Sequence, residues 1–483
     1  MGRKGTEKKY FSFILILIFF ILPTISLTKA DIGAPFKIPD YGCPMAHADR
    51  NRSDNCFLPI PKNNVGIVWH NQELISEKAG CYGLGFSGNG QIVACTYHGA
   101  EDNLVVYDFD GNILWSSKDL LNSFSFVSAP IVDIHNRIIA CDNENIILVD
   151  PFDYDSDNEI LEWKSELKYK GLVFSPVITE SGMIILATKN GPIYVYNSSN
   201  GKLISHKFLL SNENYDPFII RFFSKYNIGF FETINTPCLK GNRLYVLTHF
   251  TTGGIFSFFK RYGRLYAIDI KPDESNISER IKIAWHYDFG GPSGASPLLI
   301  NDTIYFDGER FTSSIEKDPH AYALIDKGAT SQEKWLTKLK NPVYGSFAKD
   351  PRGGFWIIDN IDAKLLRIDL QTGKAMENIS FNELIKENGK HTPCSVITIC
   401  ENKTRPILII AANTKDKNKR ISNVFAIDLE NNNSLLWSVK ISEGPFYTLD
   451  FPFGQFPVVR KDGESKIFFS TIRGGPWAIG ELK

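Results

Sequence analysis

The side chains best spaced for chemistry are three aspartates, Asp153, Asp155 and Asp157, which alternate in the stretch DYDSDNE. Carboxylates at alternate positions are the first ligands of a calcium-binding loop. The rest of that pattern fails, because Asn158 stands where the turn glycine belongs and Lys164 where the bidentate glutamate belongs. A solvated hairpin turn is therefore favoured over a metal site at these residues.

The other polar residues form no recognisable catalytic pattern. His98, in the stretch YHGAED, is expected in a loop, and no other histidine lies in a diagnostic context. No carboxylate pair of the glycosidase type can be assigned. The eight cysteines include no CxxC pair, and none is at zinc-ligand spacing from histidines. We predict no catalytic residue and leave the presence of a metal undecided.

Four of the cysteines are candidates for disulfides in an oxidising compartment. Cys43 and Cys56 flank a polar loop and form the first candidate pair. Cys394 and Cys400 form the second candidate pair. Spacing alone does not fix which cysteine bonds to which, so the connectivity stays open.

The N-terminus predicts export. A basic stretch precedes the apolar FSFILILIFFIL (Phe11 to Leu22), and Thr28, Lys29 and Ala30 offer small residues at the cleavage positions. Residues 1–30 are therefore interpreted as a signal peptide that leaves a secreted, periplasmic or extracellular protein. The alternative is an uncleaved anchor of residues 11–27 with the rest of the chain outside the cytoplasm.

The overall composition excludes two classes of protein. The 483 residues carry 53 Lys and Arg against 54 Asp and Glu, which gives a net charge of −1. That balance provides no electrostatic footprint for DNA or RNA, so no nucleic-acid partner is expected. With 43% hydrophobic and 22% charged residues, the chain can bury a large core and is not disordered.

The elements that would position any site come from one unit that repeats from residue 82 to the C-terminus. Alternating β-branched and aromatic residues between short Gly and Asn turns predict four antiparallel strands per unit. An aspartate ends the third strand, where it can bond backbone N–H groups of the turn, and a tryptophan ends the fourth, where it can wedge against the next sheet. These residues are Asp108, Asp150, Asp269, Asp326, Asp369 and Asp428, and Trp115, Trp163, Trp285, Trp335 and Trp437.

Such units predict an all-β fold, an eight-bladed β-propeller of four-stranded antiparallel blades. The last unit, at 475–483, stops after three strands, while an orphan strand at 65–69 ends in the same tryptophan. The orphan is predicted to complete the last blade, which leaves no open edge. Residues 31–64 are then an N-terminal strap and 65–483 the propeller. Seven blades is the alternative, if the degenerate repeat at 345–374 is something else.

The repeats resemble those of the quinoprotein alcohol dehydrogenase-like superfamily, the propellers with PQQ-like repeats. GRLYAID (263–269) and IDLQTGK (368–374) match the family pattern best, and the leader at 43–69 looks like the strap of such propellers. The resemblance implies the fold over nearly the whole exported chain. It is weak for function, because the same propeller serves quinone-dependent dehydrogenases, an outer-membrane assembly lipoprotein and other exported proteins.

The dehydrogenase branch of the family implies the cofactor PQQ and a calcium ion. Asp142–Asn143 and Asp359–Asn360 are the best candidates for calcium ligands, although polar hairpin turns are the favoured interpretation of both. The vicinal cysteine pair that such enzymes place over the cofactor is missing, because no two cysteines are adjacent. We therefore expect no cofactor, with PQQ and calcium reserved for the alternative of a PQQ-dependent dehydrogenase.

Long insertions fall mostly in the fourth-to-first and second-to-third loops, which share one face of a propeller. Their phenylalanines need burial or a partner, and basic residues interleave with them. The aromatics either cap the central channel or form an aromatic-basic binding face. The stretch GGIFSFFKRYG (253–263) is predicted to project as a hairpin tip. The residues predicted for the binding face are Arg221, Phe222, Phe258, Phe259, Lys260, Arg261, Arg310, Phe446 and Tyr447.

These features together favour an exported, non-enzymatic and monomeric propeller that acts as a binding scaffold through its loop face. A protein or a membrane surface is the expected partner. A carbohydrate-active propeller is a third class that the sequence leaves open.

Overall fold

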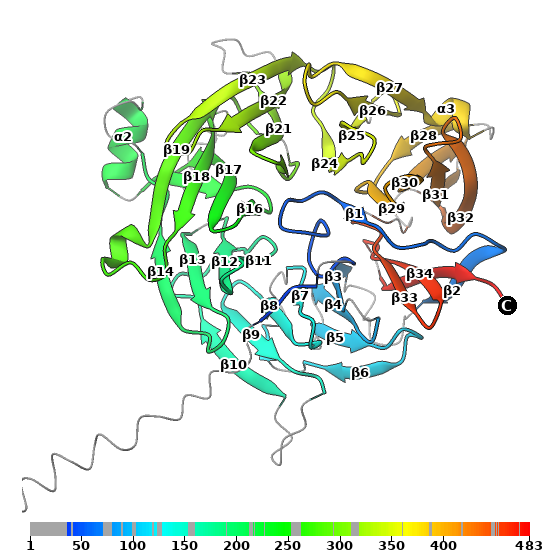
Figure 1. Cartoon of the computed structure of the whole chain (residues 1–483), viewed down its shortest axis with the longest axis horizontal. Helices are drawn as coiled ribbons and strands as arrows, with labels where there is room; N and C mark the ends of the chain where they lie inside the picture. The colour runs from blue at the N-terminus through cyan, green and yellow to red at the C-terminus, as the bar shows by residue number, and fades with distance from the viewer. Residues whose placement is uncertain are drawn as a thin grey trace, which may run out of the picture. The chain divides into compact units, whose positions relative to one another are not determined.

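The described part of the molecule is a ring of eight sheets around a central axis (Figure 1). It belongs to one compact unit, Phe36–Lys483. The predicted eight-bladed propeller is confirmed, and the degenerate repeat at 345–374 lies within the sixth blade. This computed structural model describes residues 36–483 except 40–41, 71–79, 88–89, 99–102, 118–119, 123–127, 153–159, 190, 212–215, 217, 227, 253–261, 293, 311–317, 360, 386–388, 417–418, 446–449, 451, 453 and 473.

Each blade is an antiparallel sheet whose strands follow one another from the axis outward. The first four blades are β3 (Gly80–Phe86), β4 (Val93–His98), β5 (Leu104–Tyr107) and β6 (Ile113–Ser116); β7 (Ile131–Val132), β8 (Ile138–Cys141), β9 (Asn145–Val149) and β10 (Leu161–Glu166); β11 (Val177–Ile178), β12 (Met183–Ala187), β13 (Ile193–Asn197) and β14 (Leu203–Lys207); and β16 (Cys238–Lys240), β17 (Arg243–Thr251), β18 (Gly263–Ile270) and β19 (Ile281–Phe289), to which β15 (Phe230–Thr233) adds.

The remaining four blades complete the ring in the same order. They are β20 (Leu298–Ile300), β21 (Thr303–Glu309), β22 (Pro319–Asp326) and β23 (Ser331–Lys338); β24 (Tyr344–Lys349), β25 (Phe355–Asp359), β26 (Lys364–Ile368) and β27 (Ala375–Ser380); β29 (Thr398–Glu401), β30 (Pro406–Asp416), β31 (Lys419–Asp428) and β32 (Ser434–Gly444), to which β1 (Asn55–Cys56) and β28 (Lys390–Pro393) add; and β33 (Val458–Lys461), β34 (Glu464–Phe469), β35 (Trp477–Glu481) and β2 (Val65–His70). The described helices are α2 (Phe218–Lys225), α3 (Phe381–Leu384) and a 3-10 turn, η4 (Ile277–Glu279).

The N-terminal strand closes the ring as predicted. β2 pairs antiparallel with β35, in a register that sets Val65 opposite Glu481 and His70 opposite Trp477. Trp69 then packs against Phe468 of the same blade, with ring centroids 5.6 Å apart, and reaches Tyr107 of the first blade at 6.0 Å. The last blade thereby gains its fourth strand and the ring its final contact between blades.

The repeated aspartates and tryptophans act where the pattern places them. The carboxylate of Asp369 accepts the backbone N–H groups of Gln371 and Thr372 at 3.1 and 2.7 Å, and most of the other aspartates do the same in their turns. The indole of Trp335 donates to the carbonyl of Leu370 in the next blade at 3.0 Å. Trp163 makes the equivalent bond to the next blade, whereas Trp437 donates to the carbonyl of Pro61, just before β2.

A glycine in the receiving turn makes room for three of the tryptophan rings. Gly373 has a φ of +69°, and a Cβ there would lie 2.6 Å from ring atoms of Trp335. Gly201 stands in the same relation to Trp163, and Gly111 to Trp69. The turn glycine of one blade and the tryptophan of the preceding blade are therefore one packing device, which only a residue without a side chain completes.

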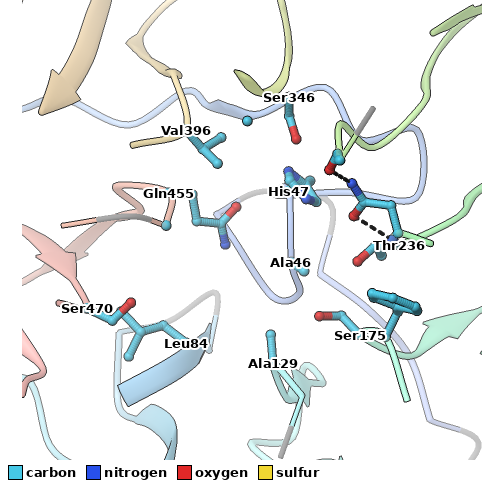
Figure 2. A pocket seen from close by; sticks show the side chains of 15 residues that line it. Ala46, His47, Leu84, Ala129, Ser175, Thr236, Ser346, Val396, Gln455 and Ser470 are labelled. Carbon is cyan, nitrogen blue, oxygen red and sulfur yellow. Dashed lines mark hydrogen bonds between the residues drawn. The ribbon is translucent and has the colours of Figure 1, made fainter. Parts of the chain in front are cut away.

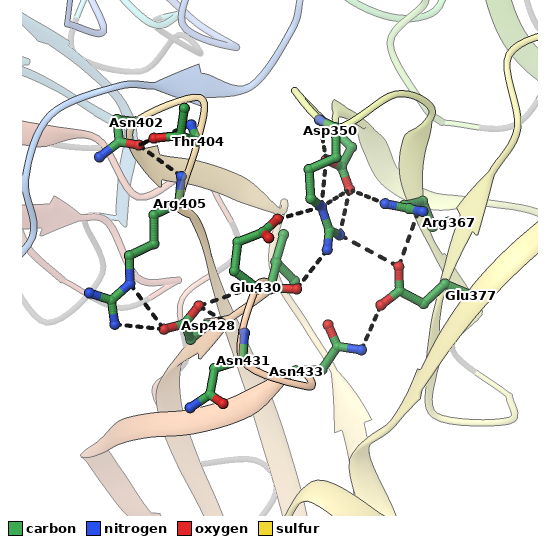
Figure 3. Close-up of polar contacts among 12 residues, drawn as sticks. Asp350, Arg367, Glu377, Asn402, Thr404, Arg405, Asp428, Glu430, Asn431 and Asn433 are labelled. Atoms are coloured by element: carbon green, nitrogen blue, oxygen red, sulfur yellow. Dashed lines mark hydrogen bonds and ion pairs between the residues drawn. The ribbon is translucent and has the colours of Figure 1, made fainter.

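Blades six and seven are also joined by charge (Figure 3). Asp350 is buried and accepts from Arg352 at 2.8 Å, while another nitrogen of Arg352 donates to the Leu429 carbonyl of the next blade at 2.6 Å. Glu377 pairs with Arg367 at 3.1 Å and accepts from Asn433 of blade seven at 2.6 Å. The network fixes one blade against the other beside the apolar core that the two blades share.

The segment 36–64, called the strap below, runs through the centre of the ring and bonds to all eight blades (Figure 1). Arg50 donates its Nε to the Ile178 carbonyl of blade three at 2.7 Å, and the Cys56 thiol accepts from the Val458 N–H of blade eight at 3.2 Å. The other six blades donate an inner N–H to the strap. Phe86, Val132, Leu239, Leu299, Lys349 and Ile399 donate to the carbonyls of Cys43, Pro44, Arg50, Asn51, Ser53 and Asp54 in that order.

The strap turns tightly to meet successive blades. His47, Ala48, Arg52 and Asp54 all have φ between +53° and +68°, the left-handed region that non-glycine residues seldom adopt. Such conformations persist only where the surroundings hold them, and here the hydrogen bonds to the ring do so. The strap is therefore an integral part of the fold.

Candidate functional site

A cavity of about 420 Å³ lies on the axis, at the end where the inner strands begin (Figure 2). Every blade contributes at least one residue to its wall, and the strap supplies Ala46 and His47. Among the described residues no Lys, Arg, Asp or Glu lines it. Its polar groups are the imidazole of His47, the hydroxyls of Ser175, Thr236, Ser346 and Ser470, and the amides of Asn235 and Gln455, and the rest of the described wall is glycine or apolar.

His47 is held by hydrogen bonds on both ring nitrogens. Its Nδ1 lies 3.0 Å from an oxygen of the buried Asp54, and its Nε2 lies 3.1 Å from the hydroxyl of Ser296. Ser296 lies 2.7 Å from Oδ1 of Asn235. Asp54, His47 and Ser296 thus stand in the order of the carboxylate, histidine and serine of a hydrolase triad.

The protons in this network run the opposite way to those of a hydrolase. Oδ1 of Asn235 accepts from the Thr236 N–H at 2.7 Å, so it is the acceptor for Ser296 as well. Ser296 has one proton and gives it to Asn235, which makes Nε2 of His47 the donor to Ser296. A histidine that donates to the serine cannot serve as its general base. Ser296 is also only 1% exposed, so the geometry supports positioning of His47 and no acyl transfer.

Buried charged groups of the strap lie under the cavity floor. Arg52 is buried, and burial lowers the pKa of its guanidinium to about 10. Burial raises the pKa of Asp54, whereas its contact with His47 acts in the opposite direction.

The second candidate site is the helix α2, in the fourth-to-first loop between blades three and four, at the outer rim (Figure 1). Ile220 is buried in the core of these blades, while Phe218 is 71% and Phe222 44% exposed. The following residues Tyr226 and Ile228 are 57% and 52% exposed. The rings of Phe218, Phe222 and Tyr226 follow one another with centroids 6.1 and 5.1 Å apart. These four residues are called the α2 stripe below.

The root of α2 is anchored by a buried arginine. Arg264 of β18 is fully buried, and it pairs with Asp216 just before the helix and with Asp288 of β19 at 2.5 Å. Its guanidinium lies 4.3 Å from the centroid of the Phe231 ring. Two carboxylates and an aromatic ring thus fix one cation, and with it the start of α2.

The structure describes three of the nine residues predicted for the binding face. Arg221 and Phe222 lie exposed on α2, and Arg310 is exposed in the second-to-third loop of blade five. α2 lies at the rim, which does not fit the interpretation of its aromatics as a cap over the channel (Figure 1). Phe258, Phe259, Lys260, Arg261, Phe446 and Tyr447, with most of the predicted hairpin tip at 253–263, lie outside the described residues.

The chain resembles known proteins in its fold alone. No protein-family model and no curated protein matches the sequence. Solved structures do match: a europium-containing methanol dehydrogenase has a TM-score of 0.52 at 11% identity, over 90% of this chain and 91% of that one. The C-terminal WD40 domain of Sif2 has a TM-score of 0.50 at 10% identity, over 87% and 99%. BamB from Moraxella catarrhalis has 0.49 at 10%, over 86% and 99%.

The shared feature is the propeller fold. The likeness to the methanol dehydrogenase confirms, at the level of fold, the resemblance that the repeats predict. An almost equal score for a WD40 domain means that the likeness carries no activity, because one fold hosts many functions.

The cofactors of the dehydrogenase alternative do not fit the axial cavity. PQQ carries three carboxylates, and the described wall offers no Lys or Arg side chain to pair with them. Among the described residues, no three His, Cys, Asp or Glu side chains are grouped to hold a metal ion. The calcium candidates Asp142 and Asp359 instead accept backbone N–H groups of their own turns, at 2.6 and 3.1 Å.

The cysteines also differ from the predicted pairing. Seven cysteines, Cys43, Cys56, Cys95, Cys141, Cys238, Cys394 and Cys400, carry free, buried thiols. Cys394 and Cys400 are not bonded, because Cys400 lies in β29 opposite Cys56 of the strap, whereas Cys394 precedes that strand. The thiols of Cys43 and Cys56 are in hydrogen-bond contact, and burial raises the pKa of Cys43 well above its usual value.

Sequence reasoning missed the residues that shape the axial cavity. His47 and Ser296 are 249 positions apart, and nothing in the local pattern of either suggests that they meet. The polar composition of the leader around His47 was the one available signal. For α2, the spacing of Phe218, Phe222 and Tyr226 at four-residue intervals was visible in the sequence and indicates a helix.

Proposed function

We propose that this protein is an exported binding scaffold that docks on a membrane surface with anionic lipids through the α2 stripe. The observation that carries the proposal is the exposure of four large apolar side chains in one place, beside the exposed Arg221 and Lys225. α2 has no acidic residue in its first turn and a lysine in its last. Aromatic residues with cationic neighbours suit the boundary between lipid tails and anionic headgroups.

The helix is held ready for a partner. Exposed phenylalanines leave apolar area in water, which costs stability unless another surface covers it. The other face of α2 is fixed by Ile220 in the core, and its root by Arg264. A preformed element loses little conformational entropy on docking.

The cationic side chains beside the α2 stripe favour lipid over a protein groove as the partner. Lys225 lies 5.8 Å from the ring centroid of Tyr226, so a cation stands directly beside the apolar rings. Phosphate headgroups would meet such cations while the rings enter the acyl boundary. The predicted export of the chain places the propeller where a membrane face is available. Among the described residues no helix is long and apolar enough to cross a bilayer.

Sedimentation with vesicles tests the proposal. The protein should pellet with phosphatidylcholine vesicles that contain phosphatidylglycerol, and less at high salt, because screening weakens the cationic contribution. The double change Phe218→Ser, Phe222→Ser should abolish pelleting. The control Ile113→Ser, Leu114→Ser alters two exposed apolar residues of β6, 44% and 37% exposed, and should pellet like the unaltered protein.

Two outcomes would overturn the proposal. One is a protein that stays in solution with every vesicle composition, which would leave the stripe to a protein partner. The other is a loss of pelleting that is equal in the stripe and control variants, which would mean that exposed apolar area acts nonspecifically.

A further inference from the structure

We propose that the axial cavity binds a neutral, hydroxyl-rich small molecule, such as one or two sugar residues. This site is separate from the α2 stripe and does not depend on the docking proposed above. The volume of about 420 Å³ lies within the range of pockets for small ligands.

The lining of the cavity disfavours ionic ligands. Among the described residues no Lys, Arg, Asp or Glu lines the wall. An ion that entered would lose hydration without gaining a counter-charge from such a side chain, which is costly. A neutral ligand loses far less hydration energy, so the site selects against acidic and basic molecules.

The polar groups of the wall favour a ligand that carries hydroxyl groups. Side-chain hydroxyls of Ser175, Ser346 and Ser470 line different sides of the cavity, and Gln455 faces it from blade eight (Figure 2). Oε1 of Gln455 is buried and accepts no hydrogen bond from any described residue. A buried acceptor without a donor is costly, and a ligand hydroxyl would supply the proton. Apolar wall such as Phe174 between the polar groups suits the C–H faces of a sugar ring.

The floor of the cavity is held rigidly. His47 and Ala46 belong to the strap, whose left-handed residues are held by hydrogen bonds to the ring. Strained backbone tends to occur where function needs a fixed group. His47 itself is locked between Asp54 and Ser296, so the floor changes little when a ligand enters.

Saturation-transfer NMR and calorimetry with the full exported chain test this inference. Maltose, cellobiose and lactose are the neutral probes, and glucuronate, glucosamine and PQQ are the charged ones. At least one neutral disaccharide should bind, and the charged probes should bind at least about tenfold more weakly. Gln455→Leu should weaken the neutral ligand about fivefold or more, since it removes one acceptor.

The control variant is Gln332→Leu, which makes the same change at an exposed position of β23. It should leave binding unchanged, and the melting temperatures of both variants show whether each is folded. If Gln455→Leu fails to fold, Ser346→Ala replaces it. Absence of binding by all three neutral disaccharides, or tighter binding of a charged probe, would overturn the inference.

Discussion

The strap at the axis and the helix α2 at the rim are both additions to the repeated blade, yet they are built in opposite ways. The strap buries Arg52 at 1% and Asp54 at 0% exposure and bonds to every blade. α2 buries one face only and leaves Phe218 and Phe222 in water. Groups that satisfy one another stabilise the fold, whereas exposed apolar groups beside cations are left for a partner. We infer that stability depends on the axis and macromolecular docking on the rim.

Removal of the strap should have the largest effect. A chain that begins at Val65 lacks residues 36–64 and with them a bonded partner for all eight inner strands. We expect it to lose its cooperative thermal transition in circular dichroism, because eight inner strands would have unpaired groups. A chain that begins at Phe36 is the control and should melt cooperatively. Equal melting temperatures for the two chains would show that the strap is dispensable.

Arg264→Met should have the next largest effect, because it tests the link between the core and α2. The change leaves Asp216 and Asp288 without their cation, and loss of one partner of a buried pair costs about 3–5 kcal/mol. Urea denaturation measures this loss. The control Lys282→Met alters an exposed lysine on β19 and should cost less than about 0.5 kcal/mol. A loss below about 1 kcal/mol at Arg264 would mean that α2 is not anchored as described.

Acid pH should lower the free energy of unfolding through His70, which lies in the strand that closes the ring. His70 stacks on Trp477 at 3.5 Å, and burial lowers its pKa to about 4. Its pKa in the unfolded chain is about 6.5, so between these values the unfolded chain binds the proton more strongly and stability falls as pH falls. With solvent screening of this half-buried ring, we expect a loss of about 1–2 kcal/mol from pH about 7 to pH about 4.

His70→Phe keeps the stacking and removes the titration. Its free energy of unfolding should therefore decline less over the same pH range than that of the unaltered protein. The difference should be about 1–2 kcal/mol. Parallel pH profiles for the two proteins would show that His70 does not couple closure to pH.

Two phenylalanines that are close in the chain should differ in their effect on stability. The exposed one should give the smallest effect of this series, and the buried one a large effect. Phe222→Ala on the α2 stripe should change the free energy of unfolding by less than about 0.5 kcal/mol, because the ring is 44% exposed. Phe231→Ala, nine positions later on β15, should cost about 3–5 kcal/mol, because that ring is 1% exposed. Similar losses of unfolding free energy at both positions in urea denaturation would mean that Phe222 supports the fold as Phe231 does. The stripe would then be structural.

The sequence predicts the repeated parts of the molecule well because each repeat carries its own local signals. Most of the turn aspartates, several of the tryptophans at the strand ends and the orphan strand at 65–69 act as predicted. The path of the strap could not be predicted, because its partners are spread over the chain from Phe86 to Val458. α2 was expected only as an aromatic insertion, since its short helix depends on burial of Ile220 between two blades.

Hydrogen–deuterium exchange of the intact protein, with and without phosphatidylglycerol-containing vesicles, tests most directly that docking lies at the rim. The account predicts slower exchange of the amides of residues 218–228 when vesicles are present, and no change in the strap at residues 42–58. Slower exchange in the strap with none in α2, or pelleting without any protection of α2, would contradict it.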